Sequence, residues 1–362
     1  MLLFALACIE DVSTSPTTGT IAPVDQPGFE RAGVVAALSP TLPGTPDDIP
    51  EEDPADEPGD EPPEDDDCLD ELAWQLNVVS NRGVGSEQTP YSSDFQGAAA
   101  TLGGFYVRGF SLNALNTTNL PFALYAGGDV SVDSGSIEFG GIEAAGDVFV
   151  DGGSIAGDIV SGGHLDGGFG TVQGDAVLAG ADHSQLSILG ERLEGVGVVS
   201  SIDLQALVAY FDALSVEHAL ADPNVEATEQ WGELLIELEP GDNVVELDGA
   251  SLGQVWGLTI DGPEGASVVL NVADAEVAID SLVWTYTGGA SAERTLLNLH
   301  SAEVLELSGG DHQVSILAPH ADTIFPAGLV TGTLVVGSLE GGGQVNHGPY
   351  DGGDCEDDSG PM

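Results

Sequence analysis

The sequence contains no lysine and only five arginines, against 61 aspartate and glutamate residues. The 362-residue chain therefore carries a formal net charge of −56 at pH 7. A protein that neutralises phosphates needs clustered cationic side chains, so this composition excludes nucleic-acid binding. It excludes electrostatic attachment to an anionic membrane surface for the same reason. The acid keeps the surface solvated, and Ca²⁺ or a high-salt medium remain plausible counter-charges.

Aromatic residues and long apolar runs are also scarce. Aromatics make up 6% of the chain, which argues against a helical or sandwich protein with large aromatic cores, and no apolar stretch approaches the length of a transmembrane helix. The three cysteines, Cys8, Cys68 and Cys355, show no CxxC or Cys/His metal spacing. Glycine is abundant by contrast, with 51 residues, which suits a fold that turns every few residues.

An internal repeat begins after residue 125. Residues 126–137 align with residues 144–155, and nine of the twelve positions are identical. Val130 and Val132 alternate with polar residues, as do Val148 and Val150, which is typical of a short strand with one buried face. The repeat predicts a right-handed parallel β-solenoid in which Val130 stacks on Val148 in the next coil. Gly-Asp pairs are expected at the corners, where Asp bonds nearby backbone N–H groups.

One segment has helical spacing instead. Residues 203–221 place apolar side chains three and four positions apart, with Ser201 or Asp203 as N-cap and Pro223 beyond the end. We expect one long helix that lies along the solenoid with its apolar face inward. The predicted organisation is a lipoprotein signal over 1–8, a disordered spacer over 9–71, the solenoid over 72–351 and an acidic tail over 352–362. The spacer is rich in Ser, Thr and Pro and then becomes acidic and Pro-rich, a composition that cannot bury enough apolar surface to fold.

The cysteines suggest anchoring and closure. The apolar run that ends at Leu6-Ala7-Cys8 resembles the end of a bacterial lipoprotein signal, which predicts lipidation of Cys8. The run is short and lacks a basic start, which favours a start codon further upstream. Cys68 and Cys355 then remain at the two ends of the solenoid as a candidate disulfide. Free or intermolecular thiols are the alternative.

Three segments of the chain form a distinctive set: residues 93–112, residues 297–302 and a closing motif. The closing motif consists of Ala318, Pro319, His320, Ala321, Asp322, Gly341, Gly342, Gly343, Gln344, Asn346 and Pro349. Together these segments resemble the choice-of-anchor A family of bacterial exported proteins. The resemblance covers residues 72–352 and implies an adhesive domain. The chain departs from the family after Tyr350, where no apolar, basic-ended sorting signal follows. The expected fold is also similar to bacterial ice-binding proteins, which pair a β-solenoid with one long helix.

No catalytic constellation stands out, and no cofactor or metal ligand is predicted. The seven histidines are scattered, and Val172 stands where a Ca²⁺-binding GGxGxD repeat needs its aspartate. The sequence therefore favours a non-catalytic, lipid-anchored adhesive or structural module on the cell or outer-membrane surface, or otherwise extracellular. Its expected partner is a glycan or matrix component. The alternatives are a polysaccharide-degrading β-helix enzyme and an ice-binding protein. Thr331 and Thr333 show the Thr-x-Thr spacing of ice binders, but rows of such pairs on successive coils do not stand out.

Overall fold

The computed structural model describes residues 69–116 and 120–351. Every described residue belongs to one compact unit within Glu64–Met362. Cys8, Cys68, Cys355, nearly all of the spacer and the acidic tail lie outside the described residues. The predictions made for them are therefore untested.

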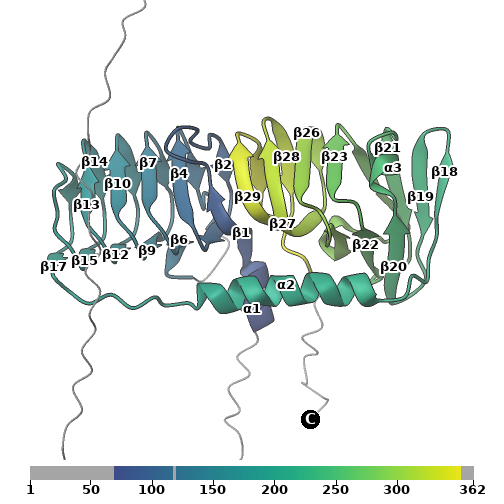
Figure 1. Cartoon of the computed structure of the whole chain (residues 1–362), viewed down its shortest axis with the longest axis horizontal. Coiled ribbons are helices and arrows are strands. Elements are labelled where there is room, and N and C mark those ends of the chain that lie inside the picture. Colours follow the sequence, from purple (N-terminus) through teal and green to yellow (C-terminus); the bar gives the residue numbers. More distant parts are fainter. Residues whose placement is uncertain (1–68, 117–119, 352–362) are drawn as a thin grey trace, which may run out of the picture. The chain divides into compact units, whose positions relative to one another are not determined.

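The described unit is a three-sided solenoid made of parallel strands, and we call its sides faces a, b and c (Figure 1). Each coil runs along face a, then face b, then face c. Face a contains β20 (Asp242–Leu247), β22 (Ser267–Val272), β25 (Thr295–Asn298), the first parts of β27 (Ser315–Phe325), β29 (Leu334–Gly341) and β1 (Leu76–Val84), β3 (Ala98–Thr101), β6 (Phe122–Ala126), β9 (Gly141–Ala144), β12 (Ile159–Ser161), β15 (Ala176–Leu178) and β17 (Arg192–Glu194).

Faces b and c complete each coil. Face b contains β23 (Glu276–Asp280), the first part of β26 (Val304–His312), the second parts of β27, β29 and β1, β4 (Gly104–Arg108), β7 (Val130–Asp133), β10 (Val148–Asp151) and β13 (Leu165–Gly167). Face c consists of two sheets. One contains β18 (Ala227–Gln230), β19 (Glu233–Glu237), β21 (Gly257–Asp261) and β24 (Val283–Thr287). The other contains the second part of β26, β28 (Gly328–Thr331), β30 (Gln344–Asn346), β2 (Asp94–Phe95), β5 (Ser111–Leu112), β8 (Ser136–Ile137), β11 (Gly153–Ile155), β14 (Gly170–Val172) and β16 (Ser187–Ile188).

The stacking predicted from the repeat is confirmed. Val148 on β10 pairs with Val130 on β7, and Val130 pairs in turn with Phe105 on β4. All three side chains are buried in the aliphatic core that fills the inside of the solenoid. Because side chains alternate along a strand, the residues between them point outward and remain available at the surface.

The chain does not wind in one direction from end to end. The coils from β1 to β17, the N-terminal half, run away from the middle of the solenoid, and the chain then crosses back along α2 (Leu204–Leu220). The coils from β18 to β30, the C-terminal half, start at the opposite end and return to the middle (Figure 1). There β29 pairs with β1 and β30 pairs with β2, a junction that we call the seam.

Helix α2 covers the outside of face a, as its apolar spacing predicted. Asp203 caps its start by accepting hydrogen bonds from the backbone N–H groups of Gln205 and Ala206. Leu207 and Phe211 are buried in a second apolar cluster. Trp74, on the short helix α1 (Leu69–Gln75), packs edge-on against Phe211. Helix α1, the single-turn α3 (Gly249–Leu252) and the 3-10 turn η1 (Ala292–Arg294) were not predicted, because so few residues carry no periodicity.

Candidate functional site

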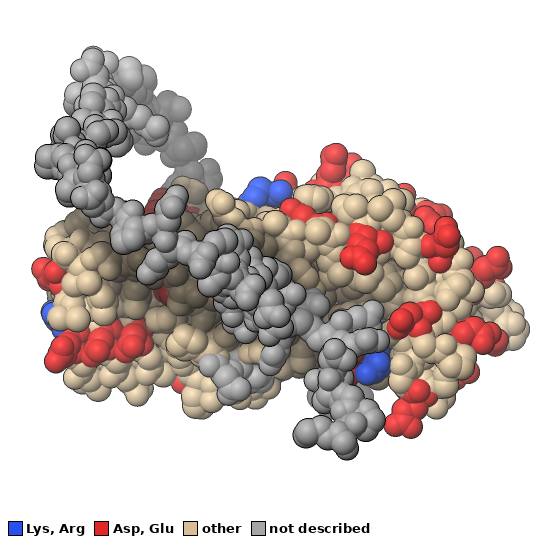
Figure 2. Space-filling model, turned by 90° about the horizontal axis from the view of Figure 1, so that it is seen from below, with Lys and Arg blue, Asp and Glu red and all other residues tan. Residues whose placement is uncertain are grey.

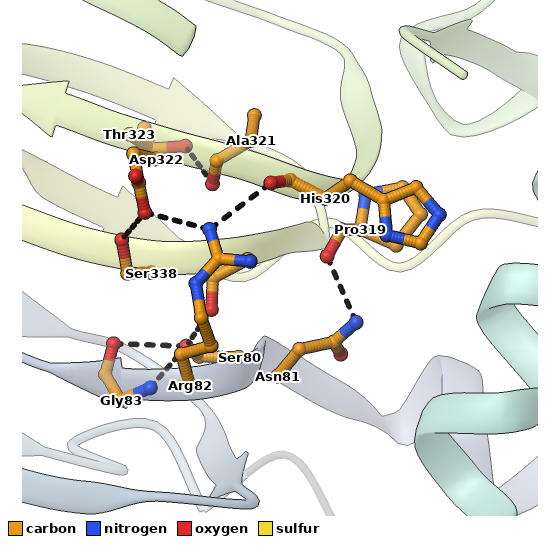
Figure 3. A network of polar contacts seen from close by, with 11 residues as sticks. Ser80, Asn81, Arg82, Gly83, Pro319, His320, Ala321, Asp322, Thr323 and Ser338 are labelled. Carbon is orange, nitrogen blue, oxygen red and sulfur yellow. Dashed lines mark hydrogen bonds and ion pairs between the residues drawn. The ribbon is translucent and has the colours of Figure 1, made fainter. Parts of the chain in front are cut away.

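The residues of the closing motif lie at the seam. Pro319 and His320 sit in β27 between its face a and face b parts, opposite the same bend in β1 (Figure 3). The side-chain amide of Asn81 donates to the Pro319 carbonyl at 2.8 Å. Arg82 donates to the His320 carbonyl at 3.0 Å and pairs with Asp322 at 2.6 Å. This part of the motif therefore fixes the returning chain to the first coil.

The glycine part of the motif closes the seam on face c. Tyr91 donates its buried hydroxyl to the Gly343 carbonyl, and a Cβ added at Gly343 would meet the ring of Phe325 at 2.4 Å. Asn77, which is 1% exposed, donates to the carbonyls of Gly332 and Asn346. The remaining motif positions are Ala318 and Ala321, both buried, and Gly341, Gly342, Gln344 and Pro349 in or beside β29 and β30. Their positions indicate that the motif builds the fold.

The cationic side chains of the described residues are all engaged by aspartates. Arg82 pairs with Asp322, and the other three pairs are Arg108–Asp133 at 2.6 Å, Arg192–Asp182 at 2.8 Å and Arg294–Asp351 at 3.2 Å. These bonds hold the pKa of the Asp133 and Asp322 carboxyls below the usual range, together with hydroxyl donors from Ser134 and Ser338. An acidic polysaccharide would thus meet no uncommitted arginine over the part of the chain that the structure describes.

Many of the acids hold one coil to the next. In the N-terminal half, Asp147 accepts the backbone N–H of His164 at 2.7 Å, and Asp158 accepts that of Asp175 at 2.7 Å. Asp129, Asp151 and Asp175 accept in the same way. These are the corner contacts predicted for the Gly-Asp pairs. Figure 2 shows how acidic side chains dominate the charged surface on the side of the solenoid that it views.

No group of three or more metal-ligating side chains comes together among residues 69–116 and 120–351. The same residues contain no helix long and apolar enough to cross a membrane. A hollow of about 810 Å³ lies between face a and the segment that leads into α2. Its buried acid, Glu143, accepts hydrogen bonds from Ser200 and Ser201, so this carboxylate anchors the segment.

A row of hydroxyl side chains runs along face c of the N-terminal half, and we call it the hydroxyl row. Its five members pair in register across five adjacent strands, so neighbouring side chains are spaced by one strand, about 4.8 Å. The members are Ser111, Ser136, Ser154, Thr171 and Ser187. Each is exposed or half-buried, and each lies beside a core residue that faces inward. The row is thus a ladder of hydroxyl groups across a parallel sheet, in which the Ser136 hydroxyl donates to Glu138.

Apolar side chains flank the hydroxyl row. Phe169, immediately before β14, is 77% exposed, and Leu189, immediately after β16, is 67% exposed. Exposed Phe139 follows β8 at the same edge as Leu189. Exposed apolar groups that border an ordered polar row are typical of surfaces that bind another molecule.

Sequence reasoning missed the hydroxyl row. The coils that carry it differ in length. Ser136 pairs with Ser111 in one neighbouring coil and with Ser154 in the other, and more residues separate Ser111 from Ser136 than separate Ser136 from Ser154, because the first of these coils contains a long loop. A fixed repeat length therefore does not align the five hydroxyls. The sequence signal that could have found them is the small polar residue just before each inward-facing Leu, Ile or Val of face c.

A family model described as "Putative Ice-binding-like adhesive domain" matches residues 84–347. Among solved structures, the ice-binding protein from the Antarctic ascomycete Antarctomyces psychrotrophicus is similar, with 14% sequence identity and a TM-score of 0.37, over 77% of this chain and 96% of that chain. No curated protein is detectably similar in sequence. The resemblance to the choice-of-anchor A family stays a prediction. The match over residues 84–347 shows that the chain belongs to the family of ice-binding-like adhesive domains.

Proposed function

We propose that this protein is a non-catalytic adhesive module that binds an extended, hydroxyl-rich polymer, such as a neutral polysaccharide, along face c. The observation that carries the proposal is the hydroxyl row, because regularly spaced hydroxyl groups suit a ligand with its own regular polar repeat. The flanking Phe169 and Leu189 offer apolar contact to the same ligand. The negative surface and the engaged arginines favour a neutral ligand over an acidic one.

Binding to insoluble polysaccharides tests this proposal. Substituting Ser154→Gln and Thr171→Gln together interrupts the row with bulkier neutral side chains and leaves the charge unchanged. We expect the double variant to bind chitin or cellulose about tenfold more weakly than wild type, equivalent to about 1.4 kcal/mol. Thr285→Gln, at an exposed position on face c of the C-terminal half, is the matched control. Equal binding by wild type and the double variant would refute the proposal.

Ice binding is the second candidate, because the family's description names it and a flat hydroxyl row also suits an ordered water lattice. The row offers mostly serines in a single line, which differs from paired threonine rows. Measuring ice-recrystallisation inhibition with the same variants separates the two functions. Inhibition by wild type that the double variant loses, without any polysaccharide binding, would replace the adhesive assignment with ice binding.

We further propose that the protein is exported and held at the bacterial surface by a lipid on Cys8, with residues 9–71 as a spacer. The apolar run before Cys8 and the acidic, Pro-rich composition support this arrangement. The variant Cys8→Ser, expressed from its natural start codon, is expected to leave the membrane fraction and appear in soluble fractions or medium. Unchanged membrane fractionation would contradict the anchor and leave the binding proposal standing.

A further inference from the structure

Face b of the N-terminal half carries a groove that is separate from the hydroxyl row and the seam. It has a volume of about 340 Å³ and is lined by residues of β4, β7, β10 and β13. Tyr106 pairs with Ser131, and Ser131 pairs with Phe149, so the three outward side chains form one row across adjacent strands. Two strand spacings, about 9.6 Å, therefore separate the backbone positions of the two aromatic residues. The small Ser131 between them leaves a gap.

The backbone makes room for the aromatic ring at one side of this gap. The ring of Tyr106 lies over Gly104, where an added Cβ would meet the ring at 2.5 Å. A side chain at position 104 would therefore displace the tyrosine. Phe149 is exposed, whereas its neighbours on β10, Val148 and Val150, face inward. The core therefore does not require an aromatic residue at position 149, and a polar side chain could stand there without loss of core packing.

Four carboxylates surround the aromatic pair. Glu87, Asp129, Asp147 and Asp166 line the same groove. Burial raises the pKa of the Tyr106 hydroxyl, and the charges of Asp129 and Glu87 raise it further, which is consistent with these carboxylates lying close to the ring. A site with aromatic faces and an excess of negative charge attracts a cation that can lose part of its hydration.

No arginine or lysine of the described residues supplies that cation, and the imidazole of His183, whose Nδ1 lies 3.6 Å from the Asp166 carboxylate, contacts only this one carboxylate of the groove. Arg108 follows Tyr106 by two positions on the same strand, but its side chain bonds Asp133 at 2.6 Å. The other arginines that the structure describes are paired elsewhere. The sequence contains no lysine. Charge complementarity therefore points to a cation from another molecule.

We propose that this groove binds the cationic side chain of a partner polypeptide, a lysine or arginine that inserts over Ser131 between Tyr106 and Phe149. Ser131 lies one strand spacing, about 4.8 Å, from the backbone position of each aromatic residue, and cation–π attraction acts when a cationic group lies within about 6 Å of a ring centre. The carboxylates at the rim then neutralise its charge. This site goes beyond the proposed polymer binding, since it lies on another face and takes a ligand of opposite character.

The test uses the full chain and a short labelled peptide of alternating lysine and glycine, with binding followed by fluorescence anisotropy at about 0.15 M salt, where long-range attraction is screened. The double variant Tyr106→Ser and Phe149→Ser continues the small polar row of Ser131. It is expected to bind at least about tenfold more weakly than wild type. The variant Glu306→Gln with Glu340→Gln removes two exposed acids from face b outside the groove and is the matched control. It is expected to change binding less than about twofold.

A third variant, Glu87→Gln with Asp166→Asn, removes the same charge as the control from within the groove and is expected to weaken binding more than the control does. Circular dichroism and thermal unfolding confirm that each variant folds. Equal loss in the groove and control variants would show attraction by net charge alone and overturn the site. Absence of peptide binding to wild type would overturn it too. If choline bound wild type as tightly as the peptide does and lost binding in the same variants, the ligand would be a small cation and the polypeptide partner would be overturned. Polysaccharide binding by the serine variant checks face c independently.

Discussion

The two halves of the solenoid stack their coils with different acid contacts. In the N-terminal half, corner aspartates accept backbone N–H groups of the following coil, as Asp147 does from His164. In the C-terminal half, most outward acids accept hydroxyl groups: Thr287 donates to Asp261, and Ser308 donates to Asp280. Asp274 is an exception, because it accepts the backbone N–H of Gly249 at 2.7 Å. The partners lie 16 to 18 residues apart in the first half and 26 to 28 in the two hydroxyl contacts of the second.

This difference explains why one half shows a sequence repeat and the other does not. A contact from a corner aspartate to a backbone amide requires a tight turn and close coil approach, which fixes both the Gly-Asp pair and the coil length. At Gly163, for instance, an added Cβ would meet the Asp147 carboxylate at 2.0 Å. A hydroxyl-to-acid pair on an open face tolerates longer and more variable coils. The acid-rich composition is therefore partly structural, in addition to solvating the surface.

The largest expected effect concerns the junction of the two halves. The rings of Trp74 and Tyr350 lie 5.0 Å apart, so the described ends of the solenoid meet. We predict that a Cys68–Cys355 disulfide links the flanking segments, and that its reduction lowers the free energy of unfolding by up to about 5 kcal/mol. Denaturant unfolding with and without reductant measures this. Peptide mapping without reductant must show the linked peptide, and full thiol labelling of both cysteines would rule the bond out.

The seam should be the next most sensitive point. Asn77→Ala removes two hydrogen bonds to carbonyls of the last coils and one from the N–H of Gly97, which leaves buried groups without partners. We expect a loss of about 3 kcal/mol in the free energy of unfolding. Asn81→Ala, which removes the bond to Pro319 at a half-buried position, is the milder comparison. A loss at Asn77 no larger than at Asn81 would show that the halves do not depend on this contact.

A matched pair of substitutions compares the coil contacts directly. Asp147→Ala leaves the His164 amide without its acceptor, and we expect a loss of about 2 kcal/mol in the free energy of unfolding. Asp261→Ala frees the Thr287 hydroxyl, which can turn to water, and we expect a loss of about 1 kcal/mol. Asp147→Asn, which keeps a side-chain oxygen, should lie closer to wild type. Chemical denaturation gives the three values. A reversed order would show that the corner contacts are not the stronger set.

A smaller effect comes from a buried histidine in the C-terminal half. His312 is 1% exposed inside the solenoid, and burial lowers its pKa below 6.5. The folded state therefore binds a proton less readily than the unfolded state, and stability declines as pH falls below about 6.5. His312→Leu should reduce this decline between pH 7 and pH 5, which chemical denaturation at a series of pH values measures. Identical pH profiles for wild type and His312→Leu would refute this contribution.

The sequence was sufficient to predict the solenoid and helix α2, because periodic apolar spacing and the 126–155 repeat record them directly. It was insufficient for the candidate site. The hydroxyl row depends on which residues of unequal coils come into register, and the face b groove depends on Ser131 lying between Tyr106 and Phe149. Both surfaces arise from the register in which one coil stacks on the next. No local pattern in the chain records that register.

Hydrogen exchange at the corner amides tests the central claim, that carboxylates hold the coils together, most directly. The N–H groups of His164, Asp175 and Glu191 lie at exposed corners and donate to aspartates of the preceding coil. The account predicts slow exchange at all three in wild type, and fast exchange at His164 with little change at Asp175 in Asp147→Ala. Fast exchange at these amides in wild type, or unchanged protection at His164 in the variant, would contradict it.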